Sequence, residues 1–192
     1  MRIGLDLDGV VADWTRSVIE NLNRYQRTNL DPAFQPPSWD WFKENLSKDH
    51  WNWIWRGGCQ GIFENIRPYP GAIKFVDDLA HLGDIIVMTS RPKIAWDTTR
   101  RWWNLHFEPS TPAGFNFFYS GLAKHNTQVD VLIEDNPEYA THYGEWEKNS
   151  NARIFLLDRA WNAGYNSYIV ERMPHYEAIL TEIERLKNEE SE

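Results

Sequence analysis

Short, nearly continuous apolar runs alternate along this chain with segments whose apolar residues recur at helical spacing. Continuous apolar character is typical of strands buried on both faces of a parallel sheet. The sequence predicts five such strands: the N-terminal run before Asp6, then Asp84–Met88, Phe115–Tyr119, Val129–Ile133 and Ala152–Leu157. The intervening segments are predicted to be helical, at about Arg16–Arg27, Trp39–Leu46, Asp49–Trp55, Ala72–Leu82, Lys93–Phe107, Pro137–Glu147 and Pro174–Lys187. Strands that alternate with helices favour an α/β fold with a doubly wound parallel sheet.

The segment between the first two strands has a different pattern. Neither alternation nor a β-branched run occurs between Trp14 and Arg67, so this segment is predicted to hold helices only. A Pro-rich connector, residues 31–38, separates the first of these helices from the next two. The helical block is expected to end at three glycines, Gly57, Gly58 and Gly61. The chain is therefore predicted to have an α/β core, residues 1–14 and 68–192, and a small helical cap inserted after the first strand, residues 15–67.

Composition and charge exclude several classes of protein. Apolar residues make up 42% of the chain and charged residues 25%, which is typical of a globular protein. The net charge is −8 without a run rich in Lys or Arg, so a nucleic-acid polymer is not an expected partner. No apolar run is long enough to span a bilayer, and Asp6 and Asp8 interrupt any signal peptide. The single Cys59 cannot form an intramolecular disulfide, so we expect a reducing, cytoplasmic compartment and no membrane partner.

Tryptophan is the unusual component of this sequence. Six of the eleven Trp residues lie within the first 55 positions, which concentrates them in and beside the predicted cap. Trp usually contributes area to a core or an interface, and this is the expected role of most of them. A dense aromatic group in a cap can also line a pocket for a flat ring, or form the contact face of a homodimer.

Two aspartates lie directly after the first predicted strand. Asp6 and Asp8 are one residue apart, and residues at this spacing project to the same side of an extended chain. Gly9 then allows a sharp turn or a close approach to a ligand. Two carboxylates so close repel each other, and a divalent cation such as Mg²⁺ removes that repulsion. The alternative is an ordinary strand followed by an Asp-Gly turn.

Polar residues also follow the other predicted strands: Thr89 and Ser90, then Lys124, then Glu134 and Asp135. The carboxyl ends of parallel strands face one crevice, where ligands bind. Hydroxyl groups can bond phosphate oxygens, an amine can neutralise developing charge, and carboxylates can hold Mg²⁺, attack phosphorus or transfer a proton. Each feature alone has an ordinary explanation as a helix cap, a solvated charge or a turn. Together, in this order, they predict a phosphoryl-transfer site.

These motifs resemble those of a known superfamily. Asp6-Leu7-Asp8-Gly9-Val10-Val11, Met88-Thr89-Ser90, Lys124 and Leu132-Ile133-Glu134-Asp135 are similar to the four ordered motifs of the haloacid dehalogenase superfamily of phosphotransferases. The resemblance covers nearly the whole chain and implies a Rossmann-like core. It implies that Asp6 is the nucleophile and Asp8 the general acid/base. It also implies Mg²⁺ bound by Asp6, the Asp8 main-chain carbonyl and Asp135, with Thr89 and Lys124 holding the phosphoryl group.

A finer resemblance is to the 5′(3′)-deoxyribonucleotidases, the cytosolic type C 5′-nucleotidase family. It is carried by residues 6–13, by Trp39-Asp40-Trp41-Phe42 and by Phe63-Glu64 before Pro68-Tyr69-Pro70-Gly71-Ala72. It implies hydrolysis of (deoxy)nucleoside monophosphates under a cap whose aromatic side chains hold the base. The residues implied are Trp14, Trp39, Trp41, Phe42 and Phe63, with Ser90 and Lys93 near the phosphate; each aromatic side chain could instead pack inside the cap. Two departures from the family are Arg91-Pro92 after Ser90, which affects the path of the substrate loop, and Glu134 before Asp135.

Two other functions are compatible with some of these features. The first is a phosphomonoesterase of the same superfamily that acts on a sugar phosphate or on a nucleic-acid 3′ end, although the acidic charge argues against the latter. The second is a phospho-receiver signalling domain, which also combines an acidic pair, a Thr and a Lys around Mg²⁺. A receiver has its phosphorylated Asp on a middle strand and no long insertion after the first acidic pair, so the order of the motifs argues against it.

Overall fold

The protein is described here by a computed structural model that covers residues 1–56, 58–107, 116–119, 123–146 and 151–189. Its sheet has six parallel strands in the order β3-β2-β1-β4-β5-β6. The strands are β1 (Arg2–Leu5), β2 (Asp84–Thr89), β3 (Asn116–Tyr119), β4 (Val131–Glu134), β5 (Arg153–Leu157) and β6 (Glu171–Met173). Because β1 lies between β2 and β4, the chain segments that follow these three strands meet at one edge of the sheet.

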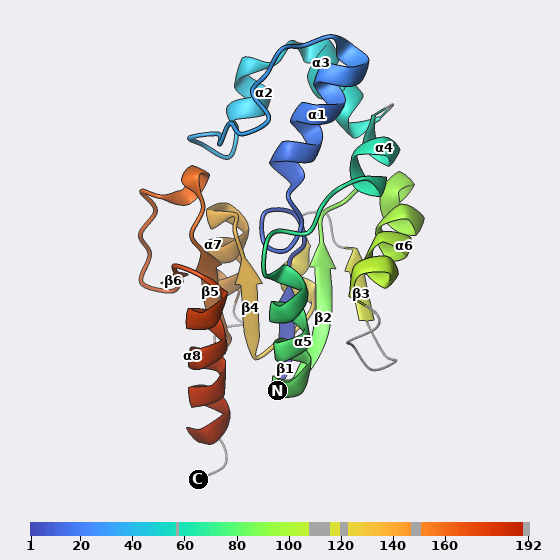
Figure 1. Ribbon diagram of the computed structural model, residues 1–192. Helices are drawn as coiled ribbons and strands as arrows, with labels where there is room; N and C mark the ends of the chain where they lie inside the picture. The colour runs from blue at the N-terminus through green and yellow to red at the C-terminus, as the bar shows by residue number, and fades with distance from the viewer. Residues whose placement is uncertain (57, 108–115, 120–122, 147–150, 190–192) are drawn as a thin grey trace.

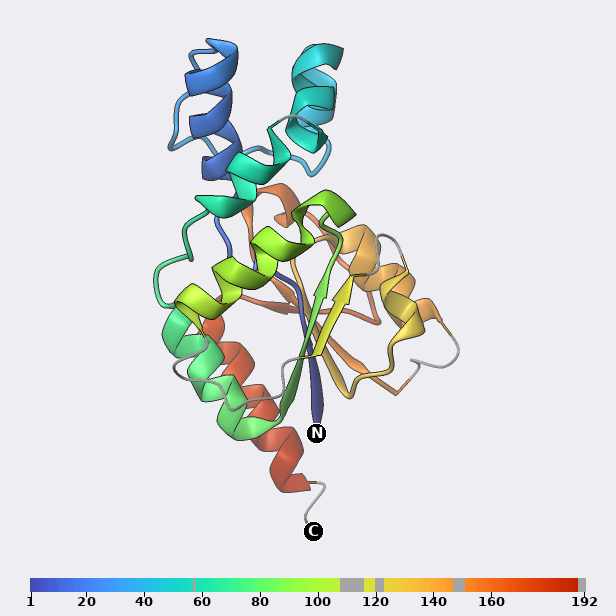
Figure 2. The same cartoon turned by 90° about the vertical axis from the view of Figure 1, so that its right-hand side faces the viewer.

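The α/β core has helices on both faces of this sheet (Figure 2). One face is covered by α5 (Ala72–Leu82), α6 (Trp96–His106) and α8 (Tyr176–Glu189), whose apolar side chains pack on alternate strand residues such as Leu5 and Val87. The intervening strand residues, including Met88 and Leu132, face the opposite layer, where α7 (Pro137–Glu145) packs. The strands are therefore apolar on both sides, which explains why their sequences are continuous apolar runs.

The cap lies beyond the carboxyl ends of the strands (Figure 1). It contains α1 (Trp14–Gln26), α2 (Trp41–Asn45), α3 (Lys48–Trp55) and α4 (Cys59–Glu64), which share a hydrophobic cluster of their own. Asp13 caps α1 by accepting a hydrogen bond from the main-chain N–H of Arg16 at 3.2 Å. The cap thus begins directly after the loop that follows β1, and it covers the edge of the sheet where the predicted site residues gather.

Three predictions about the elements were wrong in detail. Ala152–Leu157 is not the last strand, because β6 follows; β6 is three residues long, lies at the sheet edge and has no apolar run. The glycines do not end the cap, because Gly58 precedes α4 and Gly61 lies inside it; burial of Ile62 and Phe63 stabilises this short helix. The predicted helix Lys93–Phe107 is a 3-10 turn, η1 (Lys93–Ala95), followed by α6.

Candidate active site

The loop after β1 is the centre of the site. Its turn is closed by the carbonyl of Leu7, which accepts hydrogen bonds from the main-chain N–H groups of Val11 at 2.9 Å and Ala12 at 2.8 Å. Gly9 has φ +88°, a conformation that other L residues rarely adopt, and a Cβ atom there would lie 2.0 Å from Asp135 Oδ2. The glycine is therefore required both for the turn and for the close approach of Asp135.

Two distant side chains hold this loop in place. Arg159, which follows β5, donates from Nε to the Gly9 carbonyl at 2.6 Å and from Nη2 to the Val10 carbonyl at 3.1 Å. The Tyr176 hydroxyl of α8 donates to the same Val10 carbonyl at 2.6 Å. The Arg159 guanidinium also lies 4.4 Å from the ring centre of Tyr69. The loop that carries Asp6 and Asp8 is thus fixed from two parts of the core, the segment after β5 and α8.

Asp6 and Lys124 lie in direct contact. The Lys124 side chain extends from a 3-10 turn, η3 (Lys124–Asn126), and only 3% of the residue is exposed. Its Nζ donates to Asp6 Oδ1 at 2.5 Å and to Glu134 Oε2 at 2.6 Å. The other carboxylate oxygen of Glu134, Oε1, accepts the main-chain N–H groups of Asp135 and Asn136 at 3.1 and 3.2 Å. Glu134 therefore fixes Lys124 against the predicted nucleophile.

Asp135 is fully buried beside them. One of its carboxylate oxygens, Oδ2, accepts the indole N–H of Trp161 at 2.9 Å, and Asn162 donates to its main-chain carbonyl at 2.9 Å. The other oxygen, Oδ1, is buried without a hydrogen-bond partner among the described residues. One carboxylate oxygen from each of Asp6, Glu134 and Asp135 lies within 4.8 Å of the others. We call these three residues the acidic cluster.

The electrostatics of the acidic cluster fit a bound divalent cation. Burial, and then the charge of Glu134, raise the pKa of Asp6 from 3.8 to about 8. Burial and the neighbouring carboxylates of Glu134 and Asp6 raise the pKa of Asp135 well above its usual value. Burial alone would lower the pKa of Lys124, but its two carboxylate partners outweigh burial and raise it. Three carboxylates and one ammonium leave a formal charge of −2, which one Mg²⁺ would neutralise, and Asp135 Oδ1 is an oxygen donor without another partner.

Asp8 faces a different partner. Its carboxylate accepts two hydrogen bonds from Arg91, Nε to Oδ2 at 2.8 Å and Nη2 to Oδ1 at 2.6 Å. The expectation that the Asp6 and Asp8 side chains point at one cation therefore differs from the structure, where Glu134 is the third carboxylate. The difference arises because Asp8 belongs to the turn after β1 rather than to an extended strand.

Thr89 and Ser90 lie at the carboxyl end of β2. Thr89 is the last residue of β2 and is almost fully buried, and its hydroxyl oxygen accepts the main-chain N–H of Arg91 at 3.2 Å. Ser90 lines the cavity described next. Pro92 precedes η1, and Lys93, the first residue of η1, is exposed.

A cavity of about 370 Å³ connects the acidic cluster to the cap. Seven of the residues that line it are aromatic, and we call it the aromatic cavity. Of the predicted substrate-binding residues, it is lined by Trp14, Trp39, Phe42 and Ser90. The sequence did not single out four further rings that line it: Trp51, Trp55, Tyr139 and Trp161. The rings of two of these residues, Trp14 and Trp55, are stacked with their centres 5.8 Å apart.

Three predicted substrate-binding residues lie outside the lining of this cavity. Trp41 packs inside the cap, with its ring centre 4.5 Å from that of Phe34. Phe63 is buried under Arg91, whose guanidinium lies 4.4 Å from its ring centre. Lys93 is on the exposed surface of η1. For Trp41 and Phe63 the structure thus favours the alternative that the sequence left open, packing within the cap.

The sequence reasoning missed several residues of the site. Arg91 was noted only as a departure from the family, although it is the ion-pair partner of Asp8. Glu134 is among the predicted strand-end residues, but its ion pair with Lys124 was not predicted. Arg159 and Trp161 follow β5, where no polar motif was sought; the rule that residues after strand ends face the crevice would have identified them.

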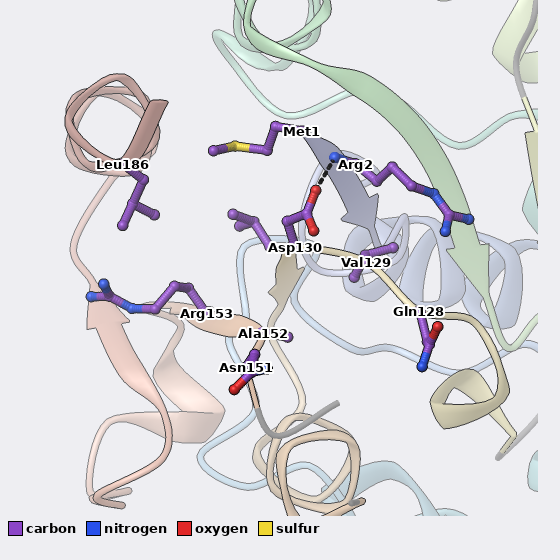
Figure 3. A pocket seen from close by; sticks show the side chains of 10 residues that line it. Met1, Arg2, Gln128, Val129, Asp130, Asn151, Ala152, Arg153 and Leu186 are labelled. Atoms are coloured by element: carbon purple, nitrogen blue, oxygen red, sulfur yellow. Dashed lines mark hydrogen bonds between the residues drawn. The ribbon is translucent and has the colours of Figure 1, made fainter. Parts of the chain in front are cut away.

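A second cleft lies at the opposite edge of the sheet, at the amino ends of the strands, with a volume of about 530 Å³ (Figure 3). Among the residues that line it are Asp130, which accepts the main-chain N–H of Arg2 at 2.6 Å, and Arg153, which is paired with Glu171 and Glu182. These charged groups already have partners within the protein, and the acidic cluster is at the other edge. The cleft therefore has no part in the chemistry of the site.

Comparisons with known proteins identify a family and a fold for this chain. Residues 1–170 match a family model described as 5′ nucleotidase, deoxy (pyrimidine), cytosolic type C protein. A predicted phosphatase from Clostridium acetobutylicum is 20% identical with a TM-score of 0.58, and the alignment covers 96% of this chain and 98% of that one. No curated protein matches the sequence significantly.

Two further solved structures share the fold. A haloacid dehalogenase-like hydrolase from Streptococcus pneumoniae is 15% identical with a TM-score of 0.62, over 94% of this chain and 97% of that one. The HAD-hydrolase YfnB from Bacillus subtilis, crystallised with magnesium, is 11% identical with a TM-score of 0.57, over 95% and 97% of the two chains. These identities establish the haloacid dehalogenase-like fold alone. The family-model match over residues 1–170 shows more: this chain belongs to the deoxy (pyrimidine), cytosolic type C family of 5′ nucleotidases.

Proposed function

We propose that this protein is a Mg²⁺-dependent phosphatase that hydrolyses (deoxy)nucleoside monophosphates through an aspartyl-phosphate on Asp6. The observation that carries the proposal is the contact of buried Asp6 with Lys124 and the rest of the acidic cluster, at the floor of the aromatic cavity. A carboxylate nucleophile, a fixed cation and a nearby acid/base are the groups that this reaction requires. The family match supports the nucleotide as substrate.

The reaction proceeds in two steps. First, an oxygen of Asp6 attacks phosphorus, the bond between phosphorus and the ester oxygen breaks, and Asp8 gives its proton to the leaving oxygen. Second, Asp8 takes a proton from water as that water attacks phosphorus, and the bond between phosphorus and Asp6 breaks. Thr89 and Lys124 hold the phosphoryl oxygens, and Lys124 balances their charge in both transition states.

The residues that would hold Mg²⁺ are Asp6, Asp135 and the main-chain carbonyl of Asp8. When bound, the ion supplies positive charge to the nucleophilic carboxylate and to the phosphoryl oxygens. Trp161 keeps Asp135 oriented through its indole N–H, and Glu134 keeps Lys124 in place. These contacts order the donors before a substrate arrives.

The aromatic cavity is the proposed site of the base. Its volume of about 370 Å³ and its aromatic lining, which includes Trp14, Trp39 and Phe42, suit a flat ring. Ser90 lines the same cavity close to the phosphate site. The part of the chain that the structure describes contains no helix long and apolar enough to cross a membrane. A cytoplasmic location, a homodimer and the absence of a nucleic-acid partner remain predictions.

Phosphate release from a panel of nucleoside monophosphates, with and without Mg²⁺, tests the proposal. We expect turnover that requires Mg²⁺ and is lost in Asp6→Asn but kept in Glu184→Gln, which changes an exposed acid of α8. Activity retained by Asp6→Asn would refute the covalent mechanism. Equal turnover of sugar phosphates would refute the nucleotide preference and leave a general phosphomonoesterase.

A further inference from the structure

Arg91 is a buried residue whose main hydrogen-bond partner is Asp8. Its side chain is fully buried, whereas 20% of the Asp8 side chain is exposed. Two of its N–H groups bond the two oxygens of Asp8, and Nη1 donates to the Thr99 hydroxyl of α6 at 3.2 Å. A bidentate pair of this kind fixes the plane of the carboxylate as well as its position.

The guanidinium is itself held between two rings. Its central carbon lies 4.4 Å from the ring centre of Phe63, in α4 of the cap, and 5.2 Å from that of Trp102, in α6 of the core. The hydrogen bond that Nη1 donates to Thr99 of α6 further fixes the orientation of the guanidinium. The orientation of Asp8 is therefore set by Arg91, 83 residues away in sequence, which is itself held by contacts from the cap and the core.

We propose that Arg91 is the positioning residue for the acid/base Asp8, and that it aims the carboxylate at the oxygen that leaves in the first step and at the water that attacks in the second. This inference rests on the proposed function for the role of Asp8. The competing role for Arg91, direct binding of the phosphate, requires N–H groups directed at the substrate, whereas three of its five are directed at Asp8 and Thr99.

The two roles differ in how they depend on the leaving group. An aryl phosphate with a weakly basic leaving group, such as p-nitrophenyl phosphate, releases its phenolate without a proton. Phenyl phosphate and nucleoside monophosphates depend more on the acid, because their leaving oxygens are more basic. Loss of a positioned Asp8 should therefore slow the formation of phosphoenzyme from these esters more, whereas loss of a phosphate-binding group should slow it for every ester alike.

The experiment measures the formation of phosphoenzyme and steady-state kcat and KM with Mg²⁺ on p-nitrophenyl phosphate, phenyl phosphate and a nucleoside monophosphate. The variants are Arg91→Met and Arg91→Lys, with Arg101→Met as the control, since Arg101 is an exposed arginine of α6. For Arg91→Met we expect kcat on the nucleotide and on phenyl phosphate to fall about 100-fold or more with KM nearly unchanged. We expect the p-nitrophenol burst to slow less than about 10-fold and the aspartyl-phosphate to accumulate, because the second step still needs Asp8.

Arg91→Lys tests the geometry rather than the charge. Its ammonium keeps the positive charge but cannot form two parallel hydrogen bonds to both oxygens of Asp8. We therefore expect an intermediate loss of activity, with the substrates affected in the same order. Arg91→Met leaves Asp8 without its partner and can lower stability; if it does not fold, Arg91→Lys carries the comparison between substrates. In the double variant Asp8→Asn/Arg91→Lys we expect no loss beyond that of Asp8→Asn, because Arg91 acts through Asp8.

Three results would overturn the inference. Equal losses in the rate of phosphoenzyme formation on all three esters, with a raised KM, would assign Arg91 to the phosphate. A further loss in the double variant, as large as in the single Arg91 variant, would separate Arg91 from Asp8. Activities in the Arg91 variants equal to those of Arg101→Met would leave Arg91 with no role in the reaction. The proposed function fails separately, if the wild type cleaves the aryl phosphates but no nucleotide.

Discussion

The acidic cluster should make the metal-free protein less stable as the pH rises. Asp6 has a pKa of about 8 in the folded protein against 3.8 in the unfolded chain, so between these values the folded state binds more protons. Stability is then fully present below pH 3.8 and falls as the pH approaches 8. One proton changes the free energy of unfolding by about 1.4 kcal/mol per pH unit, so we expect a loss of about 2–3 kcal/mol between pH 5.5 and 7.5.

Mg²⁺ should reverse this loss, because it binds the ionised carboxylates and does not bind the unfolded chain in the same way. At a free concentration 100 times its Kd, a ligand stabilises the folded state by about 2.7 kcal/mol. For a domain of this size each kcal/mol shifts Tm by about 2–4 °C, so we expect an increase of roughly 5–10 °C at pH 7.5. The increase should shrink at pH 5.5, where protons compete for Asp6 and Asp135.

Thermal unfolding in a chelator and in Mg²⁺, at several pH values between 5 and 8, measures both effects. Asp135→Asn removes one charge of the acidic cluster, so it should raise the Tm of the metal-free protein at pH 7.5 and abolish the response to Mg²⁺. Glu184→Gln removes an exposed charge on α8 and should change neither. A metal-free Tm that stays flat or rises from pH 5.5 to 7.5, or a wild type indifferent to Mg²⁺, would refute the argument.

Three further changes test other parts of the site. Trp161→Phe removes the hydrogen bond to Asp135, so Mg²⁺ should bind about 10-fold more weakly, as measured by titration of Tm; unchanged binding would mean that the indole N–H does not orient the ligand. Gly9→Ala places a Cβ 2.0 Å from Asp135 Oδ2 at φ +88°, so it should cost more than about 2 kcal/mol in chemical denaturation, whereas Gly164→Ala, in open space, should cost almost nothing. Trp39→Ala removes one wall of the aromatic cavity and should raise KM for nucleotides more than KM for phenyl phosphate, and equal changes would place the base elsewhere.

The sequence predicted the strands of the fold well because burial on both faces produces a local signal. Asp84–Met88 and Val129–Ile133 are continuous apolar runs, and the structure has β2 and β4 at these places. The signal is absent for β6, where three edge residues are mostly polar, and for α4, whose stability comes from packing against α1 and α6. β6 is too short for a pattern, and α4 depends on tertiary contacts, which periodicity does not record; both elements were therefore not predicted.

The candidate site also has a part that could be predicted from the sequence and a part that could not. Residue types placed directly after a strand, such as Asp6 and Asp135, could be found from sequence because the topology of a parallel sheet brings strand ends together. The partners of these residues could not be found. The rule places Arg91, after β2, and Trp161, after β5, at the same crevice, but over separations of 83 and 26 residues the sequence does not indicate that they bind Asp8 and Asp135.

The position of the cap should affect the acid/base and the base-binding residues but not the metal site. Every member of the acidic cluster, together with Lys124, belongs to the core, and their contacts involve core residues. Arg91, by contrast, is held in part by Phe63 of α4, and the aromatic cavity takes its walls from cap and core alike. A change that moves α4, such as Phe63→Ala, should therefore leave Mg²⁺ binding unchanged while it lowers kcat on esters that need a proton. Loss of Mg²⁺ binding in this variant would show that the cap and the metal site are coupled, contrary to the separation argued here.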